Sequence, residues 1–235
     1  MWLFNSKTSF ADSGILRGAT DWHCHLLPGV DDGIKTLPET LDALARYEEL
    51  GIKRVWFTPH IMEDMPNRPD DLRRLFSSVQ AAYGGTVELR LAAEHMLDNL
   101  FEERLAAREV LPIGEEGDLL LVETSYFTPP YDFWGVLGRI QSAGYHPLLA
   151  HPERYLYMDP DDYRRLHDMG VLLQLNLPSL AGAYGPESKA RAKRLLKLGY
   201  YAFKGTDTHR ISGLMRVAGD KGVEKSCLKQ VENLR

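Results

Sequence analysis

Apolar runs alternate with amphipathic stretches of helical period through most of the 235 residues of this chain. Gly51, Gly144, Gly170 and Gly199 stand where the amphipathic stretches should end as helices. Parallel strands need long crossover connections between them, and helices usually supply these connections. The alternation therefore predicts an α/β fold built on a parallel sheet.

The predicted elements make seven strand-to-helix units. Strands are expected up to Leu27 and at Ile52–Thr58, Thr86–Ala93, Asp118–Thr124, Tyr145–Ala150, Val171–Leu177 and Tyr200–Gly205. Helices are expected at Leu37–Leu50, Pro69–Tyr83, Leu97–Arg108, Asp132–Ala143, Pro160–Met169 and Glu187–Leu198. No linker divides the chain, which favours one domain over residues 1–235 and a closed barrel, with a doubly wound open sheet as the alternative. Residues 1–17 are expected to be irregular, and residues 211–235 to form a last helix or a tail.

Composition argues against several classes of protein. The formal charge of -5 and the pI near 5.9 give no broad basic field for nucleic acid. Cys24 and Cys227 are the only cysteines, so no disulfide framework is indicated and a reducing compartment is expected. The start, with Trp2, Leu3 and Phe4, does not resemble a signal peptide, and no run is long enough to span a membrane. We therefore expect a cytoplasmic protein.

Almost every predicted strand is followed by side chains that can bind a metal. These candidates are His23, His25, Asp32, His60, Glu94, Glu123, His151, Asp207 and His209. The carboxyl ends of parallel strands meet on one face, so these groups should converge there. Any one of them could instead be structural, as a turn aspartate, a capped strand end or a packed histidine. Together they favour a metal site.

The donor types narrow the choice of metal. Glu94 and Glu123 end very apolar runs, where an unpaired carboxylate would carry a large desolvation cost that a metal or an arginine must offset. Nine ligands exceed what one or two ions need, which predicts three ions. Imidazole and carboxylate without thiolate favour manganese, with iron or zinc as alternatives.

Several motifs in combination resemble the PHP (polymerase and histidinol phosphatase) superfamily. They are Asp21 to Gly33 with its His-Cys-His and Pro-Gly-Val-Asp-Asp-Gly segments, Thr58-Pro59-His60, Ala93-Glu94, Val122-Glu123, His151-Pro152-Glu153-Arg154 and Thr206-Asp207-Thr208-His209. Within the superfamily the chain is similar to bacterial metal-dependent protein tyrosine phosphatases encoded with capsule and exopolysaccharide genes. Cys24 stands where relatives commonly have serine, and should affect packing rather than chemistry.

This resemblance implies a single distorted (β/α)7 TIM-like barrel with three ions. His23, His25, Glu94 and Asp207 would hold one ion, and Glu94 would bridge to a second ion held by Glu123 and His151. Asp32, His60 and His209 would hold the third. Arg154 would contact the substrate phosphate, with Arg210 as a second contact whose alternative is plain surface solvation.

The implied reaction is hydrolysis of a phosphomonoester by a metal-activated hydroxide. The implied substrate is a phosphotyrosine protein, the tyrosine-rich tail of a bacterial tyrosine autokinase that controls polysaccharide export. The aromatic segment 124–134, directly after Glu123, either forms a wall for the substrate ring or covers the barrel or meets another subunit. The sequence does not predict the oligomeric state.

Rival functions are separated by particular residues. A cysteine-dependent phosphatase needs arginine six residues after the cysteine, and here Val30 and Asn233 occupy those positions. Histidinol phosphatase, or another small-molecule phosphoesterase of the superfamily, is the main enzyme alternative. The acidic balance argues against a polymerase-associated exonuclease, and Glu123 stands where many amidohydrolases carry a bridging lysine. A non-catalytic, metal-bound binding module is the further alternative.

Overall fold

Two parallel sheets form the centre of the molecule, which is a computed structural model describing residues 7–235. The larger sheet has the order β10-β9-β8-β7-β6-β4 and the smaller has the order β2-β3-β5. The larger contains β4 (His60–Ile61), β6 (Glu94–Met96), β7 (Leu119–Glu123), β8 (His146–Ala150), β9 (Leu172–Asn176) and β10 (Tyr201–Gly205). The smaller contains β2 (Thr20–Cys24), β3 (Arg54–Phe57) and β5 (Glu88–Leu91).

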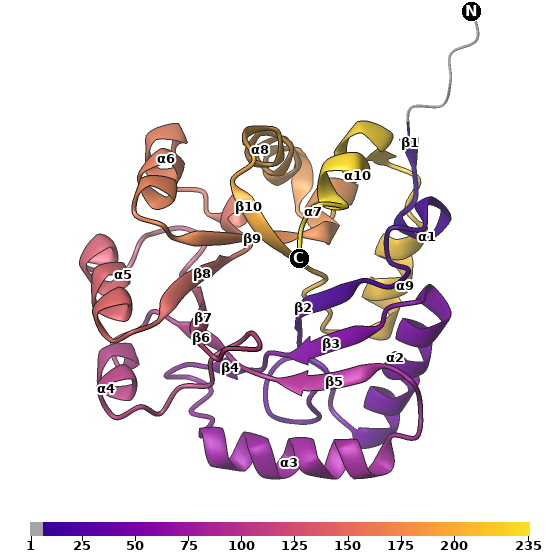
Figure 1. Cartoon of the computed structure of the whole chain (residues 1–235), viewed down its shortest axis with the longest axis horizontal. Coiled ribbons are helices and arrows are strands. Elements are labelled where there is room, and N and C mark those ends of the chain that lie inside the picture. The colour runs from indigo at the N-terminus through magenta and orange to yellow at the C-terminus, as the bar shows by residue number, and fades with distance from the viewer. Residues whose placement is uncertain (1–6) are drawn as a thin grey trace, which may run out of the picture.

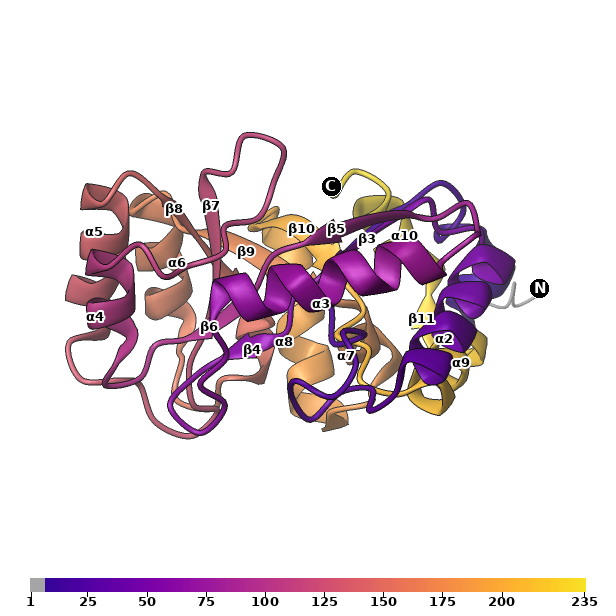
Figure 2. The same cartoon turned by 90° about the horizontal axis from the view of Figure 1, so that it is seen from below.

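Helices surround these strands, as Figure 1 shows. They are α1 (Phe10–Ser13), α2 (Leu37–Leu50), α3 (Pro69–Ala82), α4 (Phe101–Ala106), α5 (Phe133–Ser142), α6 (Pro160–Asp168), α7 (Leu177–Ala181), α8 (Gly185–Leu198), α9 (Ile211–Gly219) and α10 (Lys225–Val231), with the 3-10 turn η1 (Pro152–Arg154). Seen from below, α3 lies along the β3 and β5 side of the molecule (Figure 2). None of the helices in the described part of the chain has the length and apolar character needed to cross a bilayer.

Local sequence explains where the predicted helices begin and end. Thr36 caps α2 by accepting from the backbone N–H of Glu39, whose carboxylate accepts from Thr36 in return. Gly51 ends this helix with φ 80°, a left-handed conformation that favours glycine. Asp159 and Asp162 form the same reciprocal cap at the start of α6. The caps confirm that these boundaries can be read from sequence.

The two sheets are joined by backbone hydrogen bonds on one side and by the chain itself on the other. On one side the N–H of Asp207 donates to the carbonyl of His23 at 2.7 Å, and that of His25 to the carbonyl of Thr208 at 2.9 Å. On the other side the chain itself connects the sheets, because β3 of the smaller sheet leads directly into β4 of the larger sheet and β5 leads directly into β6. The parallel α/β prediction is confirmed, but the central strands of residues 7–235 form two parallel sheets rather than one continuous closed ladder.

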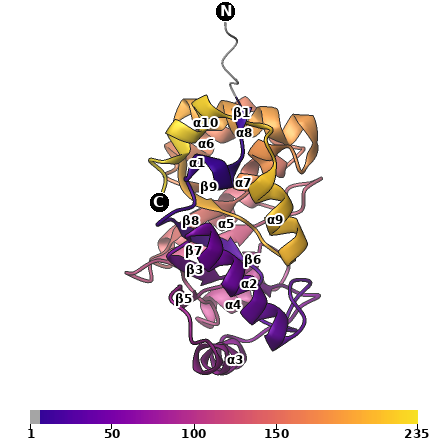
Figure 3. The same ribbon diagram turned by 90° about the vertical axis from the view of Figure 1, so that its right-hand side faces the viewer.

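Residues 7–17 and 211–235 contain more secondary structure than expected. Within the predicted irregular segment 1–17, residues 1–6 lie outside the described part. Lys7–Thr8 forms β1 and pairs antiparallel with β11 (Val223–Glu224), and α1 follows. Residues 211–235 contain α9, β11 and α10 rather than one helix or a tail. Viewed from the side that carries β1, α9 crosses in front of the strands next to α2 and α7 (Figure 3).

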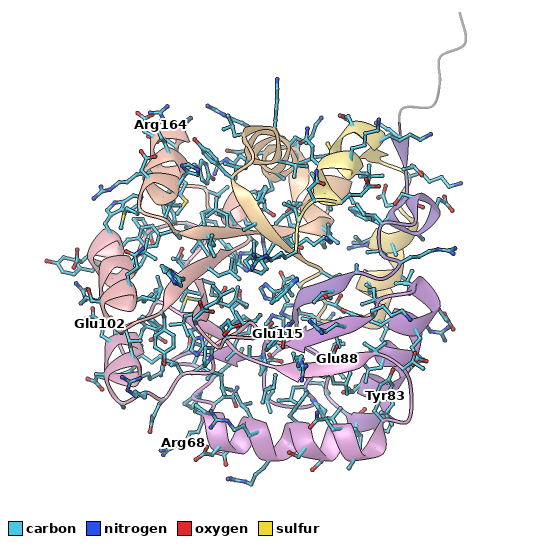
Figure 4. The ribbon with its side chains drawn as sticks, viewed as in Figure 1. Arg68, Tyr83, Glu88, Glu102, Glu115 and Arg164 are labelled. Carbon is cyan, nitrogen blue, oxygen red and sulfur yellow. The ribbon has the colours of Figure 1, made fainter. Side chains whose placement is uncertain are left out.

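Side chains fill the space inside the ring of helices, and ionic side chains lie around its rim (Figure 4). Two of the labelled residues, Glu88 and Glu115, lie nearer the middle of this view, and each accepts from Arg54 at 2.7 Å. A small inner cluster packs on the strands themselves, where Trp22 stacks on Trp56 with ring centroids 5.7 Å apart. These buried rings stiffen the strands whose far ends carry the candidate ligands.

Candidate metal centre

All nine candidate ligands meet at the carboxyl ends of the strands. Overlapping groups of ligand atoms lie within 4.8 Å of one another. The groups are His25, Asp32, His60 and His209; His23, His25 and Asp207; His23, Glu94 and His151; and His60, Glu94 and Glu123. The predicted convergence is therefore present in the geometry. The assignment of each residue to a particular ion stays a prediction.

Glu94 lies at the centre of this cluster. Its Oε2 is 3.2 Å from Nε2 of His23, 3.4 Å from Nε2 of His25 and 3.2 Å from Nδ1 of His60. Its Oε1 is 3.0 Å from Nε2 of His151. A carboxylate with imidazoles around both oxygens has the position that a bridging ligand requires.

The place of His60 differs from the expected grouping. Its Nε2 lies 3.5 Å from Oδ1 of Asp32, and that oxygen is 3.2 Å from Nε2 of His209, as the third predicted ligand set requires. Its Nδ1, however, lies 2.9 Å from Oε1 of Glu123, which was expected to act with His151. His60 therefore connects two of the groups that the sequence analysis kept separate.

Unsatisfied buried atoms test whether these residues fit cations. Oε2 of Glu94, Oε1 of Glu123 and Nδ1 of His60 are buried and make no hydrogen bond of acceptable geometry, although Nδ1 of His60 lies 3.2 Å from the Glu94 oxygen and 2.9 Å from the Glu123 oxygen. Nε2 of His23 and Nε2 of His25 also face each other at 3.1 Å. Buried polar atoms without partners are costly, and a cation among them would satisfy them together. The donor set fits metal binding.

Burial and charge pull the pKa values of the cluster in opposite directions. Burial by itself lowers the pKa of His23, but the charges of Glu94 and Asp207 outweigh it and raise that pKa. Burial and the nearby charge of His25 lower the pKa of His60, whereas Asp32, Glu123 and Glu94 outweigh them and raise it to about 10. Burial raises the pKa of Asp207, but its histidine neighbours hold it well below the usual range. The carboxylates and imidazoles therefore stabilise each other's charged forms.

Contacts behind the ligands fix the orientation of the histidine rings. Nδ1 of His23 contacts Oε1 of Gln174 at 3.0 Å, Nδ1 of His25 contacts Oδ2 of Asp31 at 2.8 Å, and Nδ1 of His209 contacts the carbonyl of Asp207 at 2.9 Å. An acceptor at Nδ1 leaves the lone pair of Nε2 free to face the cluster.

These supporting residues were not among those predicted from the sequence. Gln174 and Asn176 are alternating polar residues in the otherwise apolar strand β9, so they share one face, and this signal was available. Asn176 donates to Oδ2 of Asp207 at 3.0 Å. Asp31 was overlooked because its neighbour Asp32 was the expected ligand.

The backbone is strained where two candidate ligands leave their strands. His151 has φ 34° and Asp207 has φ 52°, values that non-glycine residues rarely adopt. At Gly205, a Cβ would lie 2.5 Å from Cβ of His23, so only glycine lets β10 approach β2 this closely. Strain of this kind persists where the surrounding structure imposes a functional geometry.

Arg154 lies at the edge of the cluster between two tyrosines. Its Nη1 donates to Oδ2 of Asp207 at 2.8 Å, and its guanidinium carbon lies 4.3 Å from the ring centroid of Tyr126 and 4.1 Å from that of Tyr184. Burial lowers the pKa of Arg154, but the charge of Asp207 outweighs it and raises that pKa. Arg154 is thus a fixed positive charge beside the cluster, with Tyr184 as a second partner that the sequence analysis missed.

The aromatic segment 124–134 divides between the two expected roles. Tyr126 reaches the pocket, whereas Phe133 is buried in the core. Phe127 and Tyr131 point to solvent, with exposed fractions of 72% and 99%. Only Tyr126 of this segment is therefore placed to contact a substrate ring.

A pocket of about 460 Å³ opens over the cluster. It is lined by Asp32, His60, Glu94, His151, Asp207 and His209, by Arg154 with Tyr126 and Tyr184, and by Arg210 and residues of α1, α7 and α9. Its volume lies in the usual range for small-molecule sites. Arg210 is exposed at the pocket rim, and a contact between it and phosphate remains a prediction.

Comparisons with known proteins point to one family. A family model described as "Capsular polysaccharide synthesis, CpsB/CapC" matches residues 19–216. Over 197 residues the chain is 26% identical to tyrosine-protein phosphatase YwqE of Bacillus subtilis, covering 81% of this chain and 77% of that protein. Over 210 residues it is 26% identical to tyrosine-protein phosphatase CpsB of Streptococcus agalactiae, covering 81% and 83%.

Solved structures share the fold. One is from the crystal structures of YwqE from Bacillus subtilis and CpsB from Streptococcus pneumoniae, described as metal-dependent tyrosine phosphatases, with a TM-score of 0.75, 23% identity and coverage of 92% of this chain and 95% of that one. Another is a histidinol phosphate phosphatase from Lactococcus lactis with zinc, L-histidinol and phosphate, with a TM-score of 0.56, 14% identity and coverage of 88% and 95%. At these identities the likeness is one of fold.

Proposed function

Because this chain belongs to the CpsB/CapC family of capsular polysaccharide synthesis, we propose that it is a metal-dependent protein-tyrosine phosphatase. The observation that carries the proposal is the meeting of nine imidazole and carboxylate ligands in one pocket beside Arg154. A cluster of cations next to a fixed guanidinium suits a phosphomonoester dianion.

The nine ligands are assigned to three ions. His23, His25, Glu94 and Asp207 would hold the first, and Glu94, Glu123 and His151 would hold the second. Asp32, His60 and His209, which converge with His25, would hold the third. Manganese is the proposed metal, and the same donors accept iron or zinc. When bound, such ions polarise phosphate oxygens and supply a hydroxide nucleophile near neutral pH.

The protein's own side chains position the phosphate and the ring. The planar guanidinium of Arg154 matches two phosphate oxygens, and Tyr126 and Tyr184 restrict where it can point. A tyrosine phenolate has a pKa of about 10 when it leaves, so it needs less help from a general acid than a serine alkoxide does. Arg210 at the rim is proposed as the second phosphate contact.

The proposal also covers the natural substrate, the cellular location and the domain organisation. The substrate is the tyrosine-rich tail of a bacterial tyrosine autokinase in polysaccharide export, and the phosphatase acts on it in the cytoplasm. The chain is proposed to work as one domain, 1–235, whose two sheets together act as a distorted (β/α)7 barrel. The hydrogen bonds that join β2 to the end of β10 support this view.

Activity of the purified protein on three phosphate esters tests the function. With manganese, we expect rapid release of phosphate from a phosphotyrosine peptide, slow release from a phosphoserine peptide of the same sequence, and loss of both after chelation. Thiol alkylation should leave activity unchanged, because Cys24 is buried and burial raises the pKa of its thiol. Slow hydrolysis of the phosphotyrosine peptide with rapid hydrolysis of histidinol phosphate would show that the protein is a small-molecule phosphatase instead. Metal binding without hydrolysis of the phosphotyrosine peptide or of histidinol phosphate would show that the protein is a non-catalytic binding module.

A further inference from the structure

The pocket does not end at the candidate ligands. Beyond Asp207 and His209 it continues along α9, whose residues Gly213, Leu214 and Val217 line it. A phenyl phosphate group with its phosphorus at the ligands therefore leaves the α9 end of the pocket free. Something longer than a phosphorylated ring can occupy the whole pocket.

The α9 end of the pocket has an apolar floor. Leu214 is buried in the core, and Val217 packs against the same core cluster. Phe10 of α1 and Leu177 of α7 line the same end of the pocket. Burying an apolar side chain of a ligand against this surface stabilises the complex.

Two arginines border this floor at opposite ends of α9. Arg210 precedes the helix and Arg216 lies in its last turn, and both are exposed and line the pocket. Across residues 7–235, neither makes an ion pair, although the whole chain carries a net charge of -5. Unpaired guanidinium groups of this kind favour carboxylates in a ligand.

We propose that the α9 end of the pocket binds the peptide segment beside the target phosphotyrosine, and that this segment is acidic with an apolar side chain. The inference rests on the proposed phosphatase function. The apolar side chain packs on Leu214 and Val217, and a neighbouring aspartate or glutamate pairs with Arg216. α9 thereby selects among phosphotyrosine peptides, while the ligand cluster and Arg154 carry out the hydrolysis.

Gly213 offers a direct way to block this end of the pocket. A Cβ at Gly213 meets no atom within 4 Å, so a larger side chain fits the helix and projects into free space. Gly138 on α5 is a matched control, because it is also helical with nothing within 4 Å and does not line the pocket.

The first experiment measures kcat and KM for an acidic phosphotyrosine peptide and for phenyl phosphate. In Gly213→Leu we expect KM for the peptide to rise roughly tenfold or more, while kcat/KM for phenyl phosphate changes little. Gly138→Leu should match the wild type on both. Equal peptide KM values in Gly213→Leu and the wild type would overturn the inference. Failure of the wild type on both substrates would instead overturn the proposed function.

The second experiment reverses the charge at Arg216. The wild type should bind a peptide with glutamates beside the phosphotyrosine more tightly than one with lysines, and Arg216→Glu should reduce or invert this preference by roughly fivefold in KM. Arg164→Glu is the control, because Arg164 is an exposed arginine on α6 that pairs with Asp161. If the wild type does not prefer the glutamate peptide, or if Arg216→Glu prefers it equally, α9 does not select substrates by their charge.

Discussion

At the scale of single residues, the site combines strained ligands with supported ones. His151 and Asp207 adopt positive φ values at the ends of their strands, and Asp207 is also held by Asn176 and Arg154. His23 is fixed from behind by Gln174. Strain at the ligands and hydrogen bonds behind them are two independent signs that this geometry serves a function.

Replacing Arg154 tests the proposed phosphate contact. We expect Arg154→Ala to lower kcat/KM for a phosphotyrosine peptide by about 2 to 4 kcal/mol of transition-state stabilisation. Arg154→Lys should recover only part of the loss, because lysine keeps the charge without the planar fork. Arg164→Ala, on the distant surface of α6, serves as the control. A wild-type rate in Arg154→Ala would remove Arg154 from the proposed mechanism.

At the scale of elements, the sequence predicted strand and helix positions better than strand continuity. The predicted strand Thr86–Ala93 corresponds to β5, and the separate strand β6 begins at Glu94. Proline cannot donate to a central ladder, and β4 begins directly after Pro59. These breaks move the chain from the smaller to the larger sheet, and no periodicity signals which sheet a short strand joins.

The candidate ligands were predictable because each follows an apolar run. Glu94 and Glu123 stand at the carboxyl ends of such runs, and parallel strands bring those ends together. The partners of the ligands were harder to find, since Tyr184 reaches Arg154 only through tertiary packing. The position of His60 between two groups likewise depends on the bend at Pro59.

Gly205 tests the close approach of β10 to β2. We expect Gly205→Ala to lower the free energy of unfolding by about 1 to 3 kcal/mol, because its Cβ would overlap His23. Gly138→Ala, a helical glycine with free space around it, should raise stability by about 0.5 to 1 kcal/mol. Denaturant unfolding of both variants measures the difference. A stable Gly205→Ala protein would contradict the close contact between the two strands.

At the scale of the whole molecule, the site links metal binding to protonation. The pKa values of His23, His25 and His60 are raised in the metal-free protein because nearby carboxylates outweigh the effect of burial. A pKa of about 10 keeps the imidazole of His60 protonated at pH 7, whereas a metal ligand must be unprotonated. Binding must therefore release protons, and metal affinity must fall as the pH is lowered.

Calorimetry in buffers of different ionisation enthalpy measures this release. Titration of manganese into the metal-free protein at pH 7 should give an apparent enthalpy that depends on the buffer, with protons passing from protein to buffer. His167→Gln is a suitable control, since His167 is an exposed residue of α6 outside the cluster. An enthalpy independent of the buffer would mean that the imidazoles are already unprotonated before metal binds.

The most direct test of the metal centre is anomalous diffraction from crystals grown with manganese. Data on both sides of the manganese absorption edge locate and count the ions without reference to activity. We expect three manganese sites within the cluster, with Glu94 shared between two of them and Asp32, His60 and His209 around the third. Crystals with no anomalous peak among these side chains, or with ions only elsewhere on the molecule, would contradict it.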